Sequence, residues 1–474
     1  MSKELIRKLE SYRKKMDLTY DSLSKEIGVP PNYIFRWKKS HRIIGIYKKI
    51  VEDFLKEKSN APAKIKPFNS SIKKARVVIT GIGMLSPFGV GNDVFFKAME
   101  NGTSGIKKIT LFDTSNFSTQ SGGEIQDFDP KEILGKEGLL DLDRATKLLL
   151  CATKFALKDS ALLIHEDNTH DIGIVVGTTF GSLHSISSFN RDAYTEGPKY
   201  VNPSRFPNTV GNSPASRVAI KFHIKGFNAT LSTGMCAFSD ALDYARDFIH
   251  LNKAQTILVG AVEDLSIQTF LGFYKLNQMS QEPRSCPFDK NRSGLIFSEA
   301  SVVFSVEEYE TAKKRKAKIY AEVLSTGSVF DPARFYRHNL KGLGMAQSME
   351  QALNNAHLKP QDIDCIFANA NATKDADSIE AKAIEKIFGR QTPVTAIKSM
   401  TGETYSASGA LSLAAAIGSL EGQYIPPTIN IKSKDAECRI NLIEKRTVKK
   451  IDKIMINTFS PDGANTSFII GKIK

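Results

Sequence analysis

The stretch Leu231-Ser-Thr-Gly-Met-Cys-Ala-Phe-Ser-Asp-Ala-Leu242 joins an apolar β-run to a helical pattern through a Ser-Thr-Gly turn. The β-run covers 227–231, and apolar side chains recur at helical spacing after Cys236. Such a strand-turn-helix can present a side chain at a helix N-terminus, where unpaired N–H groups and the helix dipole favour negative charge. The stretch therefore predicts a site that suits a thiolate nucleophile or an acyl oxyanion.

Strand and helix patterns alternate on both sides of this stretch, which predicts an α/β fold with a mixed sheet between helix layers. The predicted strands are 77–80, 171–178, 227–231, 255–259, 363–369, 394–397, 452–458 and 466–473, and the predicted helices are 142–160, 237–252, 377–388 and 408–420. The order of elements repeats in the later part of the chain. We therefore expect two similar halves, at about 75–310 and 311–474.

Composition narrows the class of protein. The 474 residues contain no apolar run of about 18 residues, so no membrane span is expected. The N-terminus lacks an apolar signal core, which favours a cytoplasmic protein. Five scattered cysteines, with no Cys-x-x-Cys pair or His cluster, favour free thiols in a reducing compartment. We expect neither a metal site nor a cofactor.

Residues 1–57 are predicted to form a separate basic helical domain, with helices at 3–16, 21–27, 31–39 and 44–57. Residues 58–74 are rich in Pro, Ser, Asn and Lys and are predicted to be a linker. The chain carries a net charge of +14, and residues 1–60 hold 15 Lys or Arg against 8 Asp or Glu. This excess indicates either a surface charge that keeps the protein soluble or an acidic partner, which would be nucleic acid or an acidic carrier protein.

The run Leu23-Ser-Lys-Glu-Ile-Gly-Val29, with Ile34 and Trp37, resembles the helix-turn-helix of repressor-type DNA-binding domains. The resemblance implies that the second helix lies near DNA. Its candidate contacts are Asn32, Tyr33, Arg36 and Lys38. The alternative is a basic helical bundle that contacts protein. The expected core is Leu23, Ile27, Ile34, Trp37 and Ile50.

Residues 75–474 resemble the β-ketoacyl-acyl-carrier-protein synthases. The resemblance rests on Ser232-Thr-Gly-Met235, on Asn369-Ala-Asn-Ala-Thr373 and on Lys398-Ser-Met-Thr-Gly-Glu403. It implies a thiolase-like, duplicated five-layer α/β fold and an acyl carrier protein as partner. It also implies a homodimer, or a heterodimer with an intact synthase. We place the edge strand of that dimer at Gln255–Val259.

The resemblance also shows what is changed at the catalytic positions. The elongating members use a cysteine and two histidines, and Met235, Asn369 and Glu403 occupy those places here. A thioether cannot form a thioester, whereas Asn369 can donate a hydrogen bond to an enolate oxygen. Glu403 would repel that oxyanion if ionised and could donate to it if protonated.

Neighbouring residues offer further candidates. Cys236 is a displaced nucleophile or a buried structural thiol, and one step along a helix turns its side chain by about 100° away from the family's acyl pocket. Lys398 and Glu299 are expected to form a structural ion pair. The resemblance places an acyl or pantetheine pocket at Phe206, Asn371, Thr373, Phe459 and Pro461, with Pro461 in place of the family's gating aromatic.

Three functions remain open. The first is that the chain is a non-condensing homologue similar to the chain-length factors of type II polyketide systems, which pair with an active synthase. Alternatively, it is an active synthase or acyltransferase with altered chemistry that uses Cys236, Asn369 or Glu403. The third possibility is a DNA-binding regulator whose synthase-like domain senses an acyl group.

Overall fold

The computed structural model describes residues 2–16, 18–43, 45–59, 75–332 and 338–473. The chain divides into two compact units, unit 1 (residues 1–74) and unit 2 (residues 75–474). Residues 60–74 lie outside the described residues, so the linker remains a prediction. Within the described ranges, no helix combines the length and the apolar character needed to cross a membrane.

Unit 1 is built from helices that bury one apolar face each. The helices are α1 (Ser2–Lys15), α2 (Tyr20–Ile27), α3 (Pro31–Ser40) and α4 (Gly45–Ser59). Their shared core contains Leu9, Leu23, Ile27, Val29, Ile34, Trp37, Ile43, Val51 and Phe54. The expectation for Ile50 is wrong, because its side chain is 37% exposed and Val51 is fully buried instead. The two residues differ by about 100° around α4, so only one of them can face the core.

The joint between α2 and α3 follows from local sequence. Thr19 caps α2 by accepting a hydrogen bond from the Ser22 amide at 3.1 Å. Gly28 ends the helix with a positive φ of 75°, which costs glycine little. Val29 is buried in the turn, and Pro31 occupies the first position of α3, where no backbone donor is needed.

The sheet of unit 2 has the same strand order in both halves. The first half holds β1 (Val77–Ser86), β5 (Ile172–Gly177), β6 (Asn228–Leu231), β7 (Thr256–Glu263) and β8 (Ala300–Glu308). The second holds β9 (Ala321–Phe330), β10 (Cys365–Phe367), β11 (Pro393–Thr395), β15 (Lys453–Phe459) and β16 (Ala464–Gly471). The order is β6-β5-β7-β8-β1 in the first half and β11-β10-β15-β16-β9 in the second. In each half the fifth strand along the chain, β8 or β16, is antiparallel to both neighbours.

Helices cover these strands in layers. The main helices are α5 (Asn92–Asn101), α7 (Arg144–Asp159), α8 (Leu183–Thr195), α9 (Ser213–Lys221), α10 (Ala237–His250), α11 (Ile267–Lys275), α13 (Leu343–Asn355), α14 (Lys374–Phe388) and α16 (Ser406–Gly422). Shorter elements are α6 (Pro130–Leu134), α12 (Tyr309–Lys314), α15 (Lys398–Thr401), β2 (Gly89–Val90), β3 (Lys107–Lys108), β4 (Ser121–Gly122), β12 (Tyr424–Ile425), β13 (Asn441–Leu442) and β14 (Thr447–Val448).

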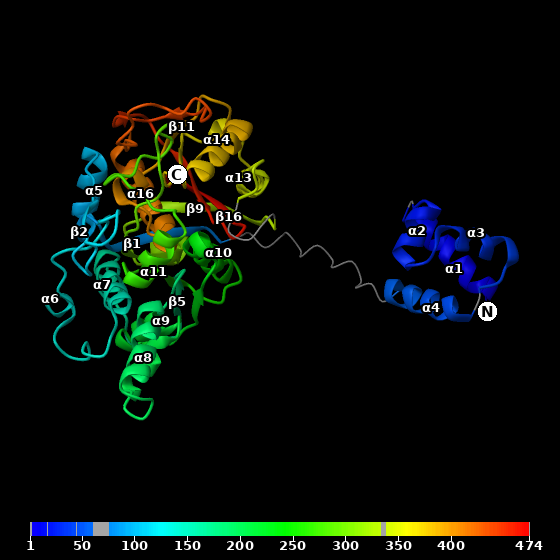
Figure 1. The fold of residues 1–474 in the computed structure, drawn as a ribbon, viewed down its shortest axis with the longest axis horizontal. Coiled ribbons are helices and arrows are strands. Elements are labelled where there is room, and N and C mark those ends of the chain that lie inside the picture. Colours follow the sequence, from blue (N-terminus) through cyan, green and yellow to red (C-terminus); the bar gives the residue numbers. More distant parts are fainter. Residues whose placement is uncertain (1, 17, 44, 60–74, 333–337, 474) are drawn as a thin grey trace. The chain divides into compact units, whose positions relative to one another are not determined.

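Helices α10 and α16 pack on each other and on strands of both halves, and α16 is buried along almost its whole length. Its small side chains allow this close approach: a Cβ on Gly409 would lie 3.1 Å from Ser239 Oγ of α10. Helix α7 packs on β1, β7 and β8, and α13 packs on β9 and β16. The two halves meet where β9 pairs with β1, and β16 lies on the other side of β9 (Figure 1). The predicted thiolase-like, duplicated α/β fold is confirmed.

One prediction about the sheet is wrong. Strand β7, which contains most of Gln255–Val259, lies between β5 and β8 and therefore is not an edge strand. Among the described residues, β6 is the terminal strand of the first half and pairs only with β5. The error arose because the strand that follows α10 inserts into the sheet beside β5 instead of extending its edge.

Candidate functional site

The turn between β6 and α10 carries Met235 into a cavity of about 800 Å³. Gly234 has a φ of 58° and opens a single 3₁₀ turn, Gly234–Cys236, that leads directly into α10. Residues of both halves line the cavity: Met235, Gln278, Leu295, His338, Asn339, Leu340, Lys341, Asn369, Asn371, Thr373, Asp375, Ala376, Ile379, Phe459 and Pro461. Asn371, Thr373, Phe459 and Pro461 therefore line one cavity, and their assignment to an acyl or pantetheine pocket stays a prediction.

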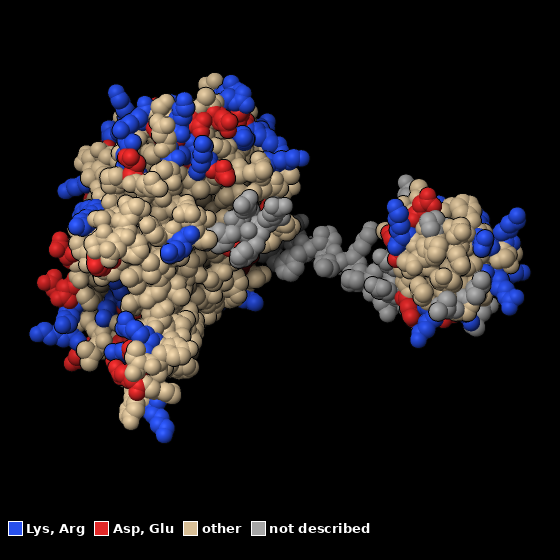
Figure 2. All heavy atoms as spheres, viewed as in Figure 1, with Lys and Arg blue, Asp and Glu red and all other residues tan. Residues whose placement is uncertain are grey.

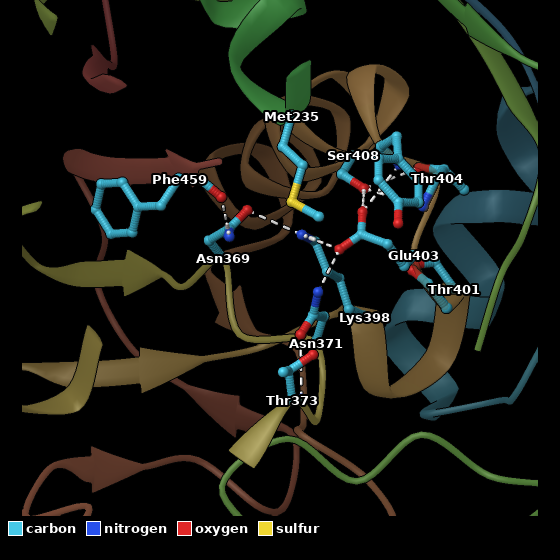
Figure 3. Close-up of polar contacts among 12 residues, drawn as sticks. Met235, Asn369, Asn371, Thr373, Lys398, Thr401, Glu403, Thr404, Ser408 and Phe459 are labelled. Carbon is cyan, nitrogen blue, oxygen red and sulfur yellow. Dashed lines mark hydrogen bonds and ion pairs between the residues drawn. The ribbon is translucent and has the colours of Figure 1, made fainter. Parts of the chain in front are cut away.

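Asn369 follows β10 and is held by two buried partners. Its Nδ2 donates to the carbonyl oxygen of Phe459 at 2.9 Å, and its Oδ1 accepts from Lys398 Nζ at 2.8 Å (Figure 3). These contacts fix the amide orientation, because only Oδ1 can accept from the ammonium group. Among the described residues, the second N–H of the amide has no hydrogen-bond partner.

Glu403, just before α16, is a fully buried carboxylate surrounded by donors. Oε2 accepts from Lys398 Nζ and from Asn371 Nδ2, each at 2.8 Å. Oε1 accepts from Ser408 Oγ at 2.6 Å and from the Tyr405 amide at 2.9 Å (Figure 3). Both oxygens are thus occupied as acceptors, and the arrangement matches an ionised Glu403 paired with Lys398.

The predicted ion pair between Lys398 and Glu299 is wrong. Glu299 pairs with Arg144 at 2.6 Å and accepts from the amides of Ile125 and Leu265. Lys398 instead reaches Glu403 across the single turn of α15. The family resemblance assigns Glu403 to a histidine position, and this assignment does not indicate that Glu403, five residues after Lys398, is the partner of the lysine.

Cys236 is buried and faces away from the cavity. Its Sγ lies 3.1 Å from the carbonyl oxygen of Thr458 and 3.3 Å from that of Ala464. Burial raises the pKa of this thiol far above its ordinary value, so it stays protonated at neutral pH. Cys236 is not among the described residues that line the cavity, so it occupies the place of a structural thiol.

Phe206 does not line the cavity, which contradicts its predicted place there. It lies in a short 3₁₀ segment, Pro203–Thr209, is 60% exposed and packs against Phe189 of α8. The segment was matched by sequence alone, and its position depends on how α8 leaves the sheet, which no local pattern reveals.

The loop that follows β15 lies against the turn that bears Met235. The Met235 amide donates to Ser460 Oγ at 3.3 Å, so this backbone donor is already used inside the chain. A Cβ on Gly234 would lie 2.3 Å from Ser460 Oγ and 2.7 Å from Asp462 Oδ2. Sequence analysis noted Pro461 in this loop and missed the contact made by Ser460.

We predict that Gly234→Ala lowers the free energy of unfolding of unit 2 by about 1–3 kcal/mol, through the positive φ and the contact with Ser460. Urea denaturation followed by circular dichroism measures the change. Adding Ser460→Gly to the variant should recover part of the loss, because it removes one of the two contacts. A loss that Ser460→Gly leaves unchanged would assign the whole effect to backbone strain.

His338 is a cavity residue that sequence analysis missed. Burial lowers its pKa to about 4, so the ring is neutral at physiological pH. Lys341 and Asp375 add opposite charges to the same wall. The signal that could have identified His338 and Lys341 is the cluster of polar residues between β9 and α13, which follows no helical or strand period.

Glu263, at the end of β7, accepts hydrogen bonds from Thr178 Oγ1 and Ser406 Oγ, each at 2.9 Å, and from the Thr179 amide. Burial raises its pKa to about 7 despite these donors, which lower it in part. A raised pKa in the folded state means that the unfolded chain loses this proton first as pH rises. The stabilisation of the folded state that comes from protonated Glu263 is therefore complete below a pH of about 4 and is lost as pH rises through about 7.

As pH rises from about 5 to about 8, we predict that the free energy of unfolding of unit 2 falls less in Glu263→Gln than in the wild type. The difference should be on the order of 3 kcal/mol. Denaturant titrations at several pH values measure the slope. An unchanged slope would show that Glu263 titrates in the folded protein as it does in the unfolded chain.

Comparison with known proteins identifies the class that this fold and site define. Residues 74–312 match the family model for the β-ketoacyl synthase N-terminal domain, and residues 320–432 match that for the C-terminal domain. The chain belongs to the β-ketoacyl synthase family.

Particular relatives are similar over the whole of their own length. The 3-oxoacyl-[acyl-carrier-protein] synthase 2 of Coxiella burnetii is 33% identical over 413 residues, which cover 85% of this chain and 100% of the relative. The enzyme of the same name from Vibrio cholerae is 32% identical, with the same coverage. Among solved structures, the ishigamide ketosynthase/chain length factor has a TM-score of 0.81 at 28% identity, covering 85% of this chain and 100% of that chain. A ketosynthase in complex with its type II polyketide acyl-carrier protein has a TM-score of 0.77 at 25% identity, with the same coverage.

Proposed function

We propose that this chain is a non-condensing member of the family that binds a carrier-linked acyl group and works beside an intact synthase, as a chain-length factor does. The observation that carries the proposal is the closed network around Glu403. Its carboxylate has four donors, Lys398 and Asn371 among them. Condensation needs a nucleophile to take the acyl chain and two donors to hold the enolate oxygen. Met235 supplies no nucleophile, and the buried carboxylate of Glu403 supplies no donor to the enolate oxygen.

A carrier protein is the proposed source of the acyl group. The cavity has room for an acyl chain beside Met235 and Leu295, and Asn339, Lys341 and Thr373 offer polar groups to the arm that bears it. One solved relative is a ketosynthase in complex with its acyl-carrier protein, which supports this class of partner.

A partner synthase is proposed to cover the open side of the first half. Strand β6 leaves one edge without a strand partner among the described residues. Large exposed apolar side chains lie on α8 and the segment that follows it: Ile186, Tyr194, Tyr200, Phe206 and Val210. Exposed apolar groups of this number are typical of a protein interface. The pairing of ketosynthase and chain length factor in a solved relative supports a heterodimer, with a homodimer as the alternative.

The alternative function is an active synthase or acyltransferase with altered chemistry. Cys236 fits this poorly, because its thiol is buried and faces the carbonyl groups of Thr458 and Ala464. Asn369 keeps one free N–H, and the neutral ring of His338 lines the same cavity. These two groups suffice for positioning an acyl oxygen but supply no covalent acyl acceptor.

The test combines the purified chain with an intact family synthase, an acyl-carrier protein and a malonyl donor. We expect a complex in sedimentation and a changed product chain length only when both chains are present. Phe206→Asp should weaken the complex, because it places a charge in the apolar face, whereas Leu163→Asp, at an exposed apolar residue outside that face, should not. A strict monomer under all conditions would contradict the proposal.

A further inference from the structure

Helix α3 of unit 1 has one face that packs inward and one that is exposed to solvent, on which the ring of Phe35 lies 4.7 Å from that of Tyr20. Ile34 and Trp37 are buried in the core of the unit. Asn32, Phe35, Arg36 and Lys39 are exposed and follow the helical spacing of three and four residues, so they form one continuous outer face. We call these four residues the α3 face.

The α3 face shares Asn32 and Arg36 with the DNA contacts predicted from the sequence, whereas Tyr33 and Lys38 have partners within unit 1. Tyr33 turns inward, with its ring 4.9 Å from that of Tyr47 and 6.1 Å from that of Trp37. Lys38 donates to the hydroxyl of Tyr20 at 2.6 Å and lies 3.7 Å from Glu10, which ties it to the neighbouring helices. Asn32 and Arg36 remain, and Phe35 and Lys39 replace the other two.

Charge on unit 1 is segregated along the chain. Residues 27–51 include six Lys or Arg and no Asp or Glu, and they contain all of α3 and the start of α4. The acidic residues of residues 1–59 lie in α1, in α2 and in the later part of α4, apart from Asp17. Figure 2 shows Lys and Arg side chains on the side of unit 1 where α3 ends and α4 begins in Figure 1. The field around the α3 face therefore attracts a polyanion.

We propose that unit 1 binds double-stranded DNA, with α3 in the major groove. That groove is about 12 Å wide and admits one α-helix. Asn32 and Arg36, four residues apart, carry the groups that pair with adenine and guanine edges, and an exposed Phe35 suits a thymine methyl group. Lys39 and Arg42 supply charge for the phosphates.

An acidic carrier protein is the competing partner, since it also answers the positive charge. Binding of an acidic protein through charge alone would require only Arg36, Lys39 and their basic neighbours. It does not account for an amide and an aromatic ring exposed on the same helix face as the arginine. The α3 face thus combines phosphate attraction with the side chains used to read bases, which favours DNA.

The test uses the full-length protein and a fluorescein-labelled DNA duplex of random sequence, with anisotropy measured between about 50 and 200 mM salt. We expect binding that falls steeply with salt, because condensed counterions are released. Arg36→Ala/Lys39→Ala should weaken binding about ten- to a hundredfold and make the salt dependence shallower. Lys3→Ala/Lys8→Ala removes the same charge from α1 and should change the affinity far less.

A selection from the random duplexes then separates base reading from charge. Asn32→Ala should relax the preference at one base pair while leaving the affinity for random DNA nearly unchanged. Equal losses in the two double variants, or no binding at low salt, would overturn the proposal. Binding of an acidic acyl-carrier protein that is lost in Arg36→Ala/Lys39→Ala, without DNA binding, would assign the surface to that protein instead. The fluorescence of Trp37, the single tryptophan of the chain and a buried core residue of unit 1, verifies in each variant that unit 1 is folded.

Discussion

Incubated with an acyl-carrier thioester and a malonyl donor, the purified protein is expected to form neither an acyl adduct nor an extended product. Met235 has no proton to lose and cannot become a thioester, and Glu403, whose two oxygens accept hydrogen bonds from buried donors, supplies no hydrogen bond to an enolate oxygen. Groups that act as a unit are lost together, so the expected condensation rate is at least about 10⁴-fold below that of an intact synthase. Mass spectrometry of the intact protein measures the adduct.

Two variants make this result informative. Met235→Cys places a thiol in the cavity at the start of α10, where a helix N-terminus favours the thiolate, and should be acylated. Met235→Cys/Asn369→His/Glu403→His restores the family residues, although Ser460 and Pro461 still hold the adjoining loop. An adduct on wild-type Cys236, with product abolished by Cys236→Ala, would contradict the non-condensing assignment.

Lys398→Met is expected to lower the free energy of unfolding of unit 2 by about 3–5 kcal/mol, because it leaves the carboxylate of Glu403 buried without its cation. The remaining donors to Glu403, Asn371 among them, cannot neutralise the charge. Urea denaturation followed by far-ultraviolet circular dichroism measures the loss. Lys398→Met/Glu403→Leu should be more stable than the single variant, since it removes both charges from the interior.

A matched control for this prediction lies on the surface. Lys434 and Glu444 form an ion pair with an N–O distance of 2.6 Å, and the lysine side chain is 53% exposed. Lys434→Met should cost at most about 1 kcal/mol, because solvent screens the exposed pair. Similar losses in Lys434→Met and Lys398→Met would mean that burial of Glu403 carries no special penalty.

Local patterns were enough to predict the α/β class, the helical character of residues 1–57 and the elements that flank the cavity. The Ser-Thr-Gly turn before Met235 is an example, because strand, turn and helix signals there lie within one short stretch. Long-range choices were harder. The insertion of β7 beside β5 and the exposure of Phe206 depend on contacts between distant segments.

The ion-pair partners of the buried carboxylates were not predicted for the same reason, because they depend on contacts that the sequence does not reveal. Glu299 and Glu403 both lie near residues that the family resemblance marks as important, and only the folded chain shows that Arg144 takes the first and Lys398 the second. The choice between Ile50 and Val51 is a smaller case, since both fit an apolar helix face to within one residue. The sequence lists the charged residues, whereas the packing of the folded chain determines which of them form ion pairs.

The single indole of the chain belongs to Trp37, which is buried in the core of unit 1. Its fluorescence therefore follows the unfolding of that unit alone, while far-ultraviolet signals come mainly from the much larger unit 2. One denaturant titration read by both signals would yield two separate midpoints from the same sample. Because Trp37 adjoins Arg36, quenching of the same emission would also report a ligand on α3 without any attached dye.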